Sequence, residues 1–223
     1  MDLTVYLPRK PLQEFFKHGV IYSPEQPSHN LYLVVAGRVK VGNALSSGET
    51  VCSIVHKGGL FGEPALVNAQ HRLDSAVTLS PVTLMAWSRS EIEQQVDVDP
   101  RLGLVLSRHL AQNCMELAER IKTRVVHRTP ERVMLAMVQF ARQAGVRMAD
   151  GSTRVESLTH QTLAEYVGTS REVVTFQLNR LRRLGLLRYN RKHIDITLDR
   201  LEEAIERSSS SQLPDETRPE RVS

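Results

Sequence analysis

The stretch LTHQTLAEYVGTSREVVTFQLNRLRRLGLL, residues 158–187, predicts two short helices joined by a tight turn. Thr159 can cap the first helix, because its hydroxyl can accept a hydrogen bond from a backbone amide that the helix leaves unpaired. Gly168 can adopt the left-handed conformation that ends a helix, and Thr169 or Ser170 can cap the next one. Apolar residues recur at helical spacing in the first helix: Leu163, Ala164 and Val167.

The second helix of this pair separates an apolar face from a polar one. Its inner face carries Val174, Leu178 and Leu181. The residues on or near its outer face are Arg171, Glu172, Thr175, Phe176, Asn179 and Arg180. A short helix, a glycine turn and a second helix with a polar front are typical of the helix-turn-helix, whose second helix enters the major groove of DNA. We therefore expect double-stranded DNA as a partner.

The front of the second helix carries groups that can read base edges. An arginine can donate two parallel hydrogen bonds to guanine, and a carboxylate can accept one from cytosine. Glu172 would repel phosphate, so it fits a base reader better than a backbone contact; the alternative is a solvated pair with Arg171 at the helix start. The surroundings favour a polyanion. Residues 171–192 hold one acidic residue and seven basic ones: Arg171, Arg180, Arg182, Arg183, Arg188, Arg191 and Lys192.

Residues 186–196 predict two short strands around a turn at residues 190–192. This hairpin would form a wing beside the helix pair and bring Arg191 and Lys192 near the phosphate backbone. The full set of predicted DNA-binding residues is His160, Gln161, Thr169, Ser170, Arg171, Glu172, Thr175, Phe176, Asn179, Arg180, Arg191 and Lys192. Within it, we expect His160, Gln161, Ser170, Arg191 and Lys192 to position the DNA backbone.

The first part of the chain has a different pattern, of short strands separated by turns. Residues 1–19 read as an irregular lead, and strand signals follow at residues 31–36, 39–41 and 51–55, with turns at 46–48 and 58–59. Such spacing is typical of an antiparallel barrel or jelly roll. Ser90 is a candidate N-cap for a short helix that follows it in the chain. We expect an α+β chain with a β-roll at 1–99, a long helix at 100–128, a winged helix-turn-helix at 129–207 and a disordered tail at 208–223.

The long helix carries one narrow apolar stripe with polar residues on its other faces. The stripe consists of Leu106, Leu110, Cys114, Leu117, Ile121 and Val125. It suits a two-stranded coiled coil between two copies of the chain, or a helix that lies against its own β-roll. A homodimer would present two recognition helices and bind an inverted repeat. Thr129-Pro130 would then mark a hinge, because proline is tolerated in the first turn of a helix but breaks its interior, and residues 131–143 would form the first helix of the DNA-binding domain.

Composition excludes several classes of protein. The 223 residues, 41% of them apolar, suffice for two small domains, and the net charge of +4 with a pI near 9.3 suits a nucleic-acid partner. No run approaches the roughly 18–20 apolar residues of a membrane span, and no signal peptide begins the chain, so we expect a cytoplasmic protein. The two cysteines give no disulfide framework or metal-ligand spacing, and no catalytic motif occurs. We expect neither an enzyme nor a bound metal or cofactor.

The chain resembles the family of bacterial transcription regulators typified by the cyclic AMP receptor protein and the fumarate–nitrate reduction regulator (the Crp/Fnr family), from about Val20 to Leu198. The motifs VGTSREVV (167–174) and LNRLRRLGLL (178–187) are similar to the family's recognition helix and its exit. LYLVVAGRVKV (31–41), GETVCSIVHKGGLFGE (48–63) and SAVTLSPVTLMAW (75–87) are similar to its β-roll sensor domain. The loop MADG (148–151) and LTHQ (158–161) resemble the cyanobacterial nitrogen-control regulators.

The resemblance implies a homodimeric DNA-binding activator with RNA polymerase as a further partner. It also implies one departure in the recognition helix, because the position of Phe176 usually carries a second guanine-reading arginine in the family. A phenyl ring cannot donate to a base edge but can contact a thymine methyl. The half-site should therefore share part of the family's consensus and change at that base.

The effector pocket implied by the resemblance consists of Gly62, Glu63, Arg72, Asp74, Ser75 and Leu117. Gly62-Glu63 and Ser75 match groups that hold a cyclic nucleotide, but Asp74 stands where the family has an arginine, and Leu117-Ala118 replaces the Thr-Ser pair that meets the base. Arg72 could supply the lost charge, toward a cyclic phosphate or the carboxylates of 2-oxoglutarate, although an exposed loop arginine is the interpretation we favour. We therefore expect DNA binding that does not depend on cyclic AMP.

Three alternatives stay open at this point. The regulator could be gated by 2-oxoglutarate or a cyclic nucleotide. It could be a thiol redox sensor that uses Cys52 or Cys114, although two cysteines are too few for an iron–sulfur cluster, which needs about four. From another class of protein, the β-roll could belong to a ligand-binding signalling module without DNA contact, against which the basic helix-turn-helix and wing argue.

Overall fold

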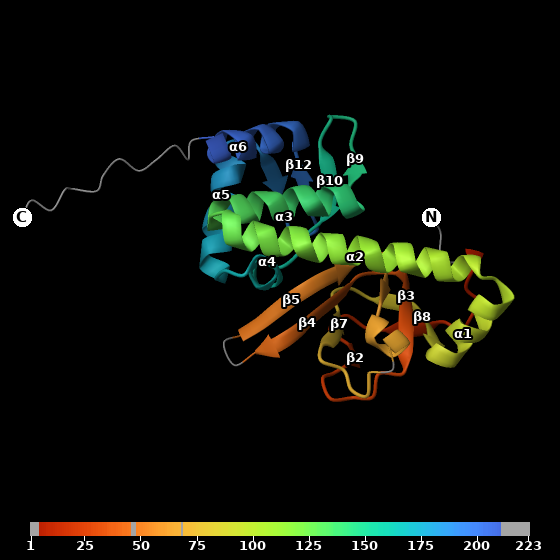
Figure 1. The fold of residues 1–223 in the computed structure, drawn as a ribbon. Coiled ribbons are helices and arrows are strands. Elements are labelled where there is room, and N and C mark those ends of the chain that lie inside the picture. Colours follow the sequence, from red (N-terminus) through yellow and green to blue (C-terminus); the bar gives the residue numbers. More distant parts are fainter. Residues whose placement is uncertain (1–4, 46–47, 68, 211–223) are drawn as a thin grey trace, which may run out of the picture. The chain divides into compact units, whose positions relative to one another are not determined.

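The computed structural model describes residues 5–45, 48–67 and 69–210. The chain divides into two units, Met1–Ile121 and Lys122–Ser223. The expected α+β class is confirmed: an antiparallel β-roll and a long helix precede a C-terminal helix-turn-helix domain, as Figure 1 shows. The turn expected at residues 46–48 falls largely outside the described residues.

The β-roll of the first unit contains two four-stranded antiparallel sheets. One has the order β1-β8-β3-β6, formed by Gln13–Phe15, Val82–Ser88, Asn30–Ala36 and Leu60–Phe61. The other has the order β2-β7-β4-β5, formed by Val20–Tyr22, Ser75–Thr78, Val39–Leu45 and Gly48–Val55. A 3-10 turn, η2, covers Glu63–Val67. The prediction of an irregular lead at residues 1–19 is wrong for β1, which pairs with β8 through Gln13 and Leu84.

Alternation along β3 builds two cores, because successive side chains of a strand point to opposite faces of its sheet. Tyr32 and Val34 face the other sheet and pack with Tyr22, Val41 and Phe61. On the opposite face, the strand residues Leu31, Leu33 and Trp87 pack with residues of the helices that follow the roll: Ile92, Leu102, Val105 and Leu106. The β-roll is thus held both between its sheets and on the helix side.

Helix α1 (Arg89–Val98) begins two residues earlier than expected. Its cap is Ser88, not Ser90: the Ser88 Oγ accepts from the backbone N–H of Glu91, and the Glu91 carboxylate accepts from the backbone N–H of Ser88. This reciprocal arrangement is a capping box, which satisfies two amides at once. Ser90 lies inside the helix and its hydroxyl is 3.1 Å from that of Ser88.

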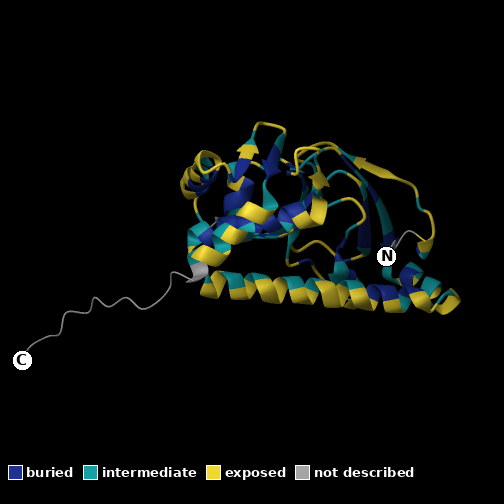
Figure 2. Ribbon diagram, turned by 90° about the horizontal axis from the view of Figure 1, so that it is seen from above, coloured by how far each residue is buried: buried dark blue, intermediate teal, exposed yellow. Residues whose placement is uncertain are grey.

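Helix α2 (Arg101–Val126) is the expected long helix, and its exposed residues run along most of its length in Figure 2. Leu106 does not belong to the exposed stripe: it is 7% exposed and packs in the core of the first unit, so its assignment to a dimer interface is wrong. The reason is that the first turns of α2 lie on the roll. The remaining stripe residues are exposed: Leu110, Cys114, Leu117, Ile121 and Val125.

The second unit is built on α3 (Thr129–Ala144), which begins two residues earlier than expected, so that Pro130 lies in its first turn. A four-stranded sheet of order β11-β12-β10-β9 follows, made of Leu187–Tyr189, His193–Ile196, Thr153–Glu156 and Val146–Arg147. Along the chain, helices α4 (His160–Val167) and α5 (Arg171–Arg183) follow β10 and precede β11. The last helix, α6 (Leu198–Ser210), extends past the point where we predicted a disordered tail to begin. Residues 211–223 of that tail lie outside the described residues.

A buried carboxylate joins the two ends of the second unit. Glu131, in the first turn of α3, is 3% exposed. Its Oε1 accepts from the Ser208 hydroxyl at 2.7 Å. Its Oε2 accepts from the Arg128 backbone N–H at 3.2 Å and lies 3.1 Å from Nδ1 of His127. Since a buried charge is costly unless hydrogen-bonded, these contacts explain why Ser208 belongs to the folded helix.

The sheet of the second unit contains an ion pair that should contribute to its stability. Arg154 and Asp195 are cross-strand neighbours, and Nε and Nη2 of Arg154 donate to the Asp195 carboxylate at 2.6 and 2.9 Å. Asp195 is buried, and hydrogen bonding from Arg154 holds its pKa below the usual range. A group with a depressed pKa stabilises the fold above its unfolded pKa, and that stabilisation is lost on acidification.

We therefore expect Asp195→Ala to lower the free energy of unfolding by about 1–3 kcal/mol near neutral pH. The difference from wild type should shrink as the pH falls below about 4, where the unfolded carboxyl takes up its proton. Urea unfolding at several pH values measures both effects. Glu203→Ala, which breaks the exposed pair with Arg207 on α6, is the control and should cost less than about 0.5 kcal/mol. Equal losses in both variants would contradict this assignment.

Candidate nucleic-acid interface

Local sequence signals position the two helices of the helix-turn-helix as predicted. Thr159 caps α4, with its Oγ1 accepting from the Thr162 backbone N–H at 3.0 Å. Gly168 ends α4 in the left-handed conformation with φ of 76°, which glycine adopts without a steric penalty. Of the two candidate caps for α5, the structure selects Ser170, whose Oγ accepts from the Val173 backbone N–H.

Helix α5 presents its two faces as its sequence predicts. Val174, Leu178 and Leu181 are buried, and this inner face sets the rotation of the helix about its axis. Four of the predicted DNA-facing side chains are exposed: Arg171, Glu172, Phe176 and Arg180. Phe176, with 59% of its surface exposed, is a large apolar side chain without a core partner. Thr175 and Asn179, by contrast, are half-buried and held by neighbours.

The Glu172 carboxylate is ionised and held at the start of α5. Hydrogen bonds from its own backbone N–H and from the Ser170 hydroxyl hold its pKa below the usual range, and the Arg171 charge adds to the effect. A negative group in the first turn of a helix is also favoured by the helix dipole. The side chain therefore offers a charged acceptor at the exposed end of the helix.

His160 is linked to the recognition helix through Thr175. Its Nδ1 lies 2.7 Å from Thr175 Oγ1, and that hydroxyl donates to the Arg171 carbonyl at 2.8 Å. Because the hydroxyl has one hydrogen, it must accept from His160, so the neutral ring carries its proton on Nδ1. Burial, together with the nearby Arg171 charge, lowers the pKa of His160. The ring is thus neutral at pH 7 in the free protein. Gln161 is exposed beside it.

The predicted wing is present as the β11–β12 hairpin. Strands β11 and β12 pair antiparallel, with Leu187 opposite Ile196 and Tyr189 opposite Ile194. At the turn, Asn190 Oδ1 accepts from the backbone N–H groups of Lys192 and His193 at 2.8 and 3.0 Å. Such bonds from an asparagine to the following backbone close tight turns. Arg191 and Lys192 are exposed at the tip.

One of the seven basic residues counted in this region is already paired. The Arg188 guanidinium forms an ion pair with Asp150 and lies 4.0 Å from Asp195. Asp150 belongs to the 148–151 loop, where its Oδ1 accepts from the backbone N–H and hydroxyl of Ser152. Sequence reasoning missed this pairing because Asp150 and Arg188 are distant in the chain. Arg188 therefore contributes less to the field of the interface than its sequence position indicates.

Sequence reasoning also missed Tyr189, which contacts three residues near the DNA-facing surface. Its hydroxyl donates to Asn179 Oδ1 at 2.9 Å. Its ring centroid lies 6.0 Å from that of His160 in an edge-on arrangement and 5.3 Å from the guanidinium carbon of Arg182. The only signal in the sequence is an aromatic residue next to the basic turn of the wing, which does not predict these contacts.

In the β-roll, the expectation that Arg72 is an exposed loop residue is wrong, since 2% of its surface is exposed. Its Nη2 donates to the Asn30 carbonyl at 2.7 Å, and its guanidinium carbon lies 4.1 Å from the ring centroid of Tyr22. An aromatic face attracts a guanidinium, which compensates part of its desolvation. The rings of Tyr22, Tyr32 and Phe61 stack beside it.

The structure brings several of the predicted pocket residues together. Asp74 lies near Arg72, accepts from the Tyr22 hydroxyl at 3.4 Å, and burial raises its pKa. Within the described residues, Arg72 Nε and Nη1 and Asp74 Oδ1 are buried without a hydrogen-bond partner. Gly62, with φ of 90°, lies against Arg72, and a side chain there would approach the Asn30 carbonyl to 2.8 Å.

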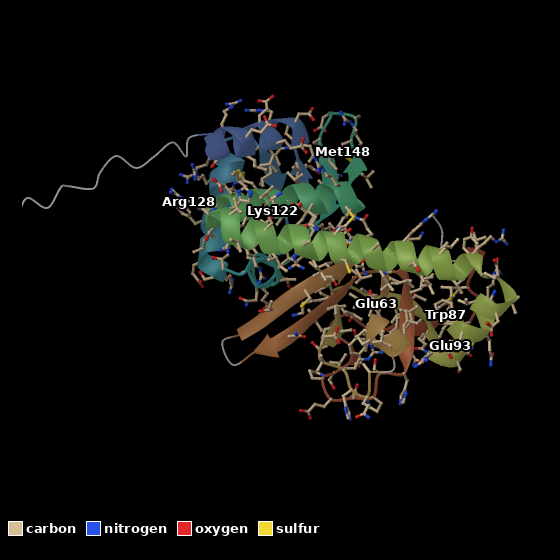
Figure 3. The ribbon with its side chains drawn as sticks, in the orientation of Figure 1. Glu63, Trp87, Glu93, Lys122, Arg128 and Met148 are labelled. Atoms are coloured by element: carbon tan, nitrogen blue, oxygen red, sulfur yellow. The ribbon has the colours of Figure 1, made fainter. Side chains whose placement is uncertain are left out.

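The other pocket residues are engaged elsewhere or exposed. Glu63 lies beside α2, as Figure 3 shows, where its Oε1 accepts from Asn113 Nδ2 at 2.8 Å and stands 3.6 Å from His109 Nε2. The Ser75 hydroxyl donates to the Gly42 carbonyl at 3.1 Å. Leu117 is half-exposed on α2.

Neither a metal-binding cluster nor a membrane-spanning helix occurs in the described residues. Among residues 5–45, 48–67 and 69–210, no group of three or more His, Cys, Asp or Glu side chains is arranged to hold a metal ion. No helix in the same ranges combines the length and the hydropathy that crossing a membrane requires. Cys52 is half-buried and Cys114 exposed, both as free thiols.

Comparison with known families and proteins agrees with this geometry. Residues 12–99 match the cyclic nucleotide-binding domain family, and residues 131–204 match the Crp-like helix-turn-helix domain family. The transcriptional regulator SdrP of Thermus thermophilus is 31% identical over 182 residues, which cover 78% of this chain and 83% of the relative. The global nitrogen regulator of a Nostoc species is 27% identical over 83% of this chain and 84% of the relative.

Solved structures share the fold. A CRP/FNR-family transcriptional regulator from Thermus thermophilus superposes with a TM-score of 0.71 at 28% identity, covering 88% of this chain and 98% of that one. FixK2 from Bradyrhizobium japonicum reaches a TM-score of 0.77 at 20% identity over 86% of this chain and 96% of its own, a likeness of fold alone. With a β-roll, a long helix and a winged helix-turn-helix in the same order as these regulators, the chain belongs to the Crp/Fnr family of transcription regulators.

Proposed function

We propose that the protein is a homodimeric, sequence-specific DNA-binding regulator of the cytoplasm, which activates transcription through contact with RNA polymerase and does not need cyclic AMP. The observation that carries the DNA-binding part is the exposed polar front of α5, where Arg171, Glu172 and Arg180 are all open to solvent. Wing residues Arg191 and Lys192 extend its positive charge.

The exposed stripe of α2 supports the dimer. Leu117, Ile121 and Val125 are 50%, 65% and 80% exposed, although they belong to one face of a long helix. Large apolar side chains gathered in this way mark an interaction surface, and a parallel pairing of two such helices would bury them. Two recognition helices related by a two-fold axis would then read half-sites about one helical turn, roughly 34 Å, apart.

Replacing Leu110 and Leu117 by lysine should produce a monomer that binds DNA poorly, because each charge would have to be buried at the centre of the helix pair. Sedimentation velocity measures the oligomeric state, and a gel shift measures binding. Gln112→Lys is the control, since Gln112 is exposed on the polar side and faces Glu116. A double variant that remains a dimer would show that the stripe is not the interface.

The residues of α5 and the wing should contribute to binding in different ways. Arg171→Ala should cost on the order of 1–3 kcal/mol and relax the preference for one guanine in each half-site. Lys192→Ala should weaken all sequences alike and lower the slope of log affinity against log salt by about 1 for each subunit. Anisotropy titrations at several salt concentrations, with selection of bound sequences from a random pool, separate the two. If Arg171→Ala selected the wild-type sequence unchanged, α5 would not read the groove as proposed.

Independence from cyclic AMP rests on residues of the β-roll. Asp74 stands where the family has the arginine that holds the nucleotide's phosphate, and a carboxylate there would repel a cyclic phosphate. Leu117 and Ala118 provide no hydroxyl for the base. The buried Arg72 guanidinium already contacts the Tyr22 ring and the Asn30 carbonyl.

One observation favours a second candidate, a regulator gated by a small anion such as 2-oxoglutarate. The buried Nε and Nη1 of Arg72 have no hydrogen-bond partner among the described residues. Buried donors are nearly always satisfied, by protein, water or ligand, so an anion bound at Arg72 would remove this deficit. The buried Asp74 and the nearby Glu63 oppose a dianion at the same place.

Titration calorimetry with cyclic AMP, cyclic GMP and 2-oxoglutarate distinguishes these two candidates. We expect no measurable heat of binding from any of them at millimolar concentration. We also expect that the protein binds its DNA site equally well with and without these compounds. Arg72→Met, which keeps much of the side-chain volume but removes the cation, is the matched variant for any ligand that binds. Tight binding of one compound, lost in Arg72→Met and coupled to DNA affinity, would replace the ligand-independent proposal by the gated one.

A further inference from the structure

Tyr189 connects three elements around the DNA-facing surface. It is the last residue of β11 in the wing, and its side chain contacts α4 through His160 and α5 through Asn179 and Arg182. The hydroxyl donates a hydrogen bond of ordinary length, 2.9 Å, to Asn179 Oδ1. The aromatic ring is half-buried, so the bond is partly shielded from water.

The bond from Tyr189 restricts which hydrogen bonds the Asn179 amide can make to DNA. An asparagine side chain has one accepting oxygen and an NH2 group with two donors. Reading adenine requires both ends of the amide, one accepting from N6 and the other donating to N7. In this structure the Tyr189 hydroxyl occupies one of the two lone pairs of the oxygen and directs that end of the amide at the wing, so the NH2 group is the end that can face a partner outside the protein. An amide held in this way suits an acceptor, such as a phosphate oxygen or the O6 and N7 of guanine.

The neighbours of Asn179 are held by the same cluster. His160 packs edge-on against the Tyr189 ring and donates from Nδ1 to Thr175, whose hydroxyl in turn donates to the carbonyl of Arg171. A chain of directed contacts therefore runs from the wing to the first turn of α5. Such contacts fix the rotamers of interface side chains before DNA arrives, which lowers the entropy lost on binding.

We propose that Tyr189 is a positioning residue for DNA recognition, which fixes the amide of Asn179 so that it donates to the DNA and cannot read adenine. This inference rests on the proposed DNA-binding function and names a residue through which the wing acts on the specificity of α5. Tyr189 itself is not required to touch the DNA.

The test uses the full-length chain and the duplex that the wild type selects from a random pool. Tyr189→Phe keeps the ring, and with it the contacts to His160 and Arg182, but removes the hydroxyl. We expect its affinity for the selected duplex to fall about three- to tenfold per subunit, the worth of one hydrogen bond. We also expect its own selected sequences to accept adenine at a half-site position where the wild type does not, because the released amide can rotate.

A double-mutant cycle tests whether Tyr189 acts through Asn179. Asn179→Ala should weaken binding in the wild-type background, but by no more than about twofold when Tyr189→Phe is already present, because coupled residues are not additive. Asn179→Asp keeps an acceptor for Tyr189 but has no donor, so it should bind no better than Asn179→Ala. Equal effects of Asn179→Ala in both backgrounds would overturn the proposal, as would wild-type affinity of Asn179→Asp.

Tyr166→Phe is the matched control. Tyr166 also donates through its hydroxyl to a side-chain amide oxygen, that of Gln139 at 2.8 Å, but it is buried between α3 and α4. Both variants should show a similar small change in thermal stability, and only Tyr189→Phe should change the selected DNA sequence. A Tyr189→Phe protein that selects the wild-type sequence would refute the role of Tyr189 and leave the proposed function intact. A wild-type protein that selects no sequence at all would refute the proposed function, and this inference with it.

Discussion

Burial of one face of α5 determines what the second unit presents to its surroundings. Val174, Leu178 and Leu181 are removed from water, and three side chains at this spacing provide several kcal/mol of hydrophobic stabilisation. A rotation of the helix by one residue would expose them and bury Arg171 or Glu172 instead. The polar front of the helix-turn-helix therefore follows from packing, with no additional interaction needed to turn those side chains outward.

Features set by local chemistry could be predicted from the sequence. Thr159 and Ser170 begin the two helices by accepting hydrogen bonds from backbone N–H groups three residues later, and Gly168 ends the first helix in the left-handed conformation. All three effects involve residues only a few positions away in the chain. The cap of α1 could not be chosen in this way, because Ser88 with Glu91 and Ser90 with Glu93 both have the spacing of a capping box. We predicted Ser90 as the cap, and the hydrogen bonds between Ser88 and Glu91 show that Ser88 fills this position.

Features that depend on distant parts of the chain could not be predicted. The burial of Arg72 follows from aromatic rings on other strands, which offer a guanidinium a face in place of water. Leu106 continues the periodicity of the α2 stripe, yet it packs on the roll, because one helix changes neighbours along its length and a heptad pattern does not record that change. No sequence motif marks Tyr189, because its role depends on contacts with three residues of other elements.

The carboxylate of Glu131 also has a consequence for how the chain can be divided. One oxygen accepts from the residue just before α3, and the other accepts from Ser208, in the last turn of α6. The start of the first helix and the end of the last described helix of the DNA-binding unit are thus joined at the Glu131 carboxylate. A fragment that began after Arg128 or stopped before Ser208 would leave a buried charge short of donors, whereas one that kept both would preserve the closure. The contacts that close this unit therefore begin before its first helix and extend to Ser208, at the start of a serine run that resembles a linker in the sequence.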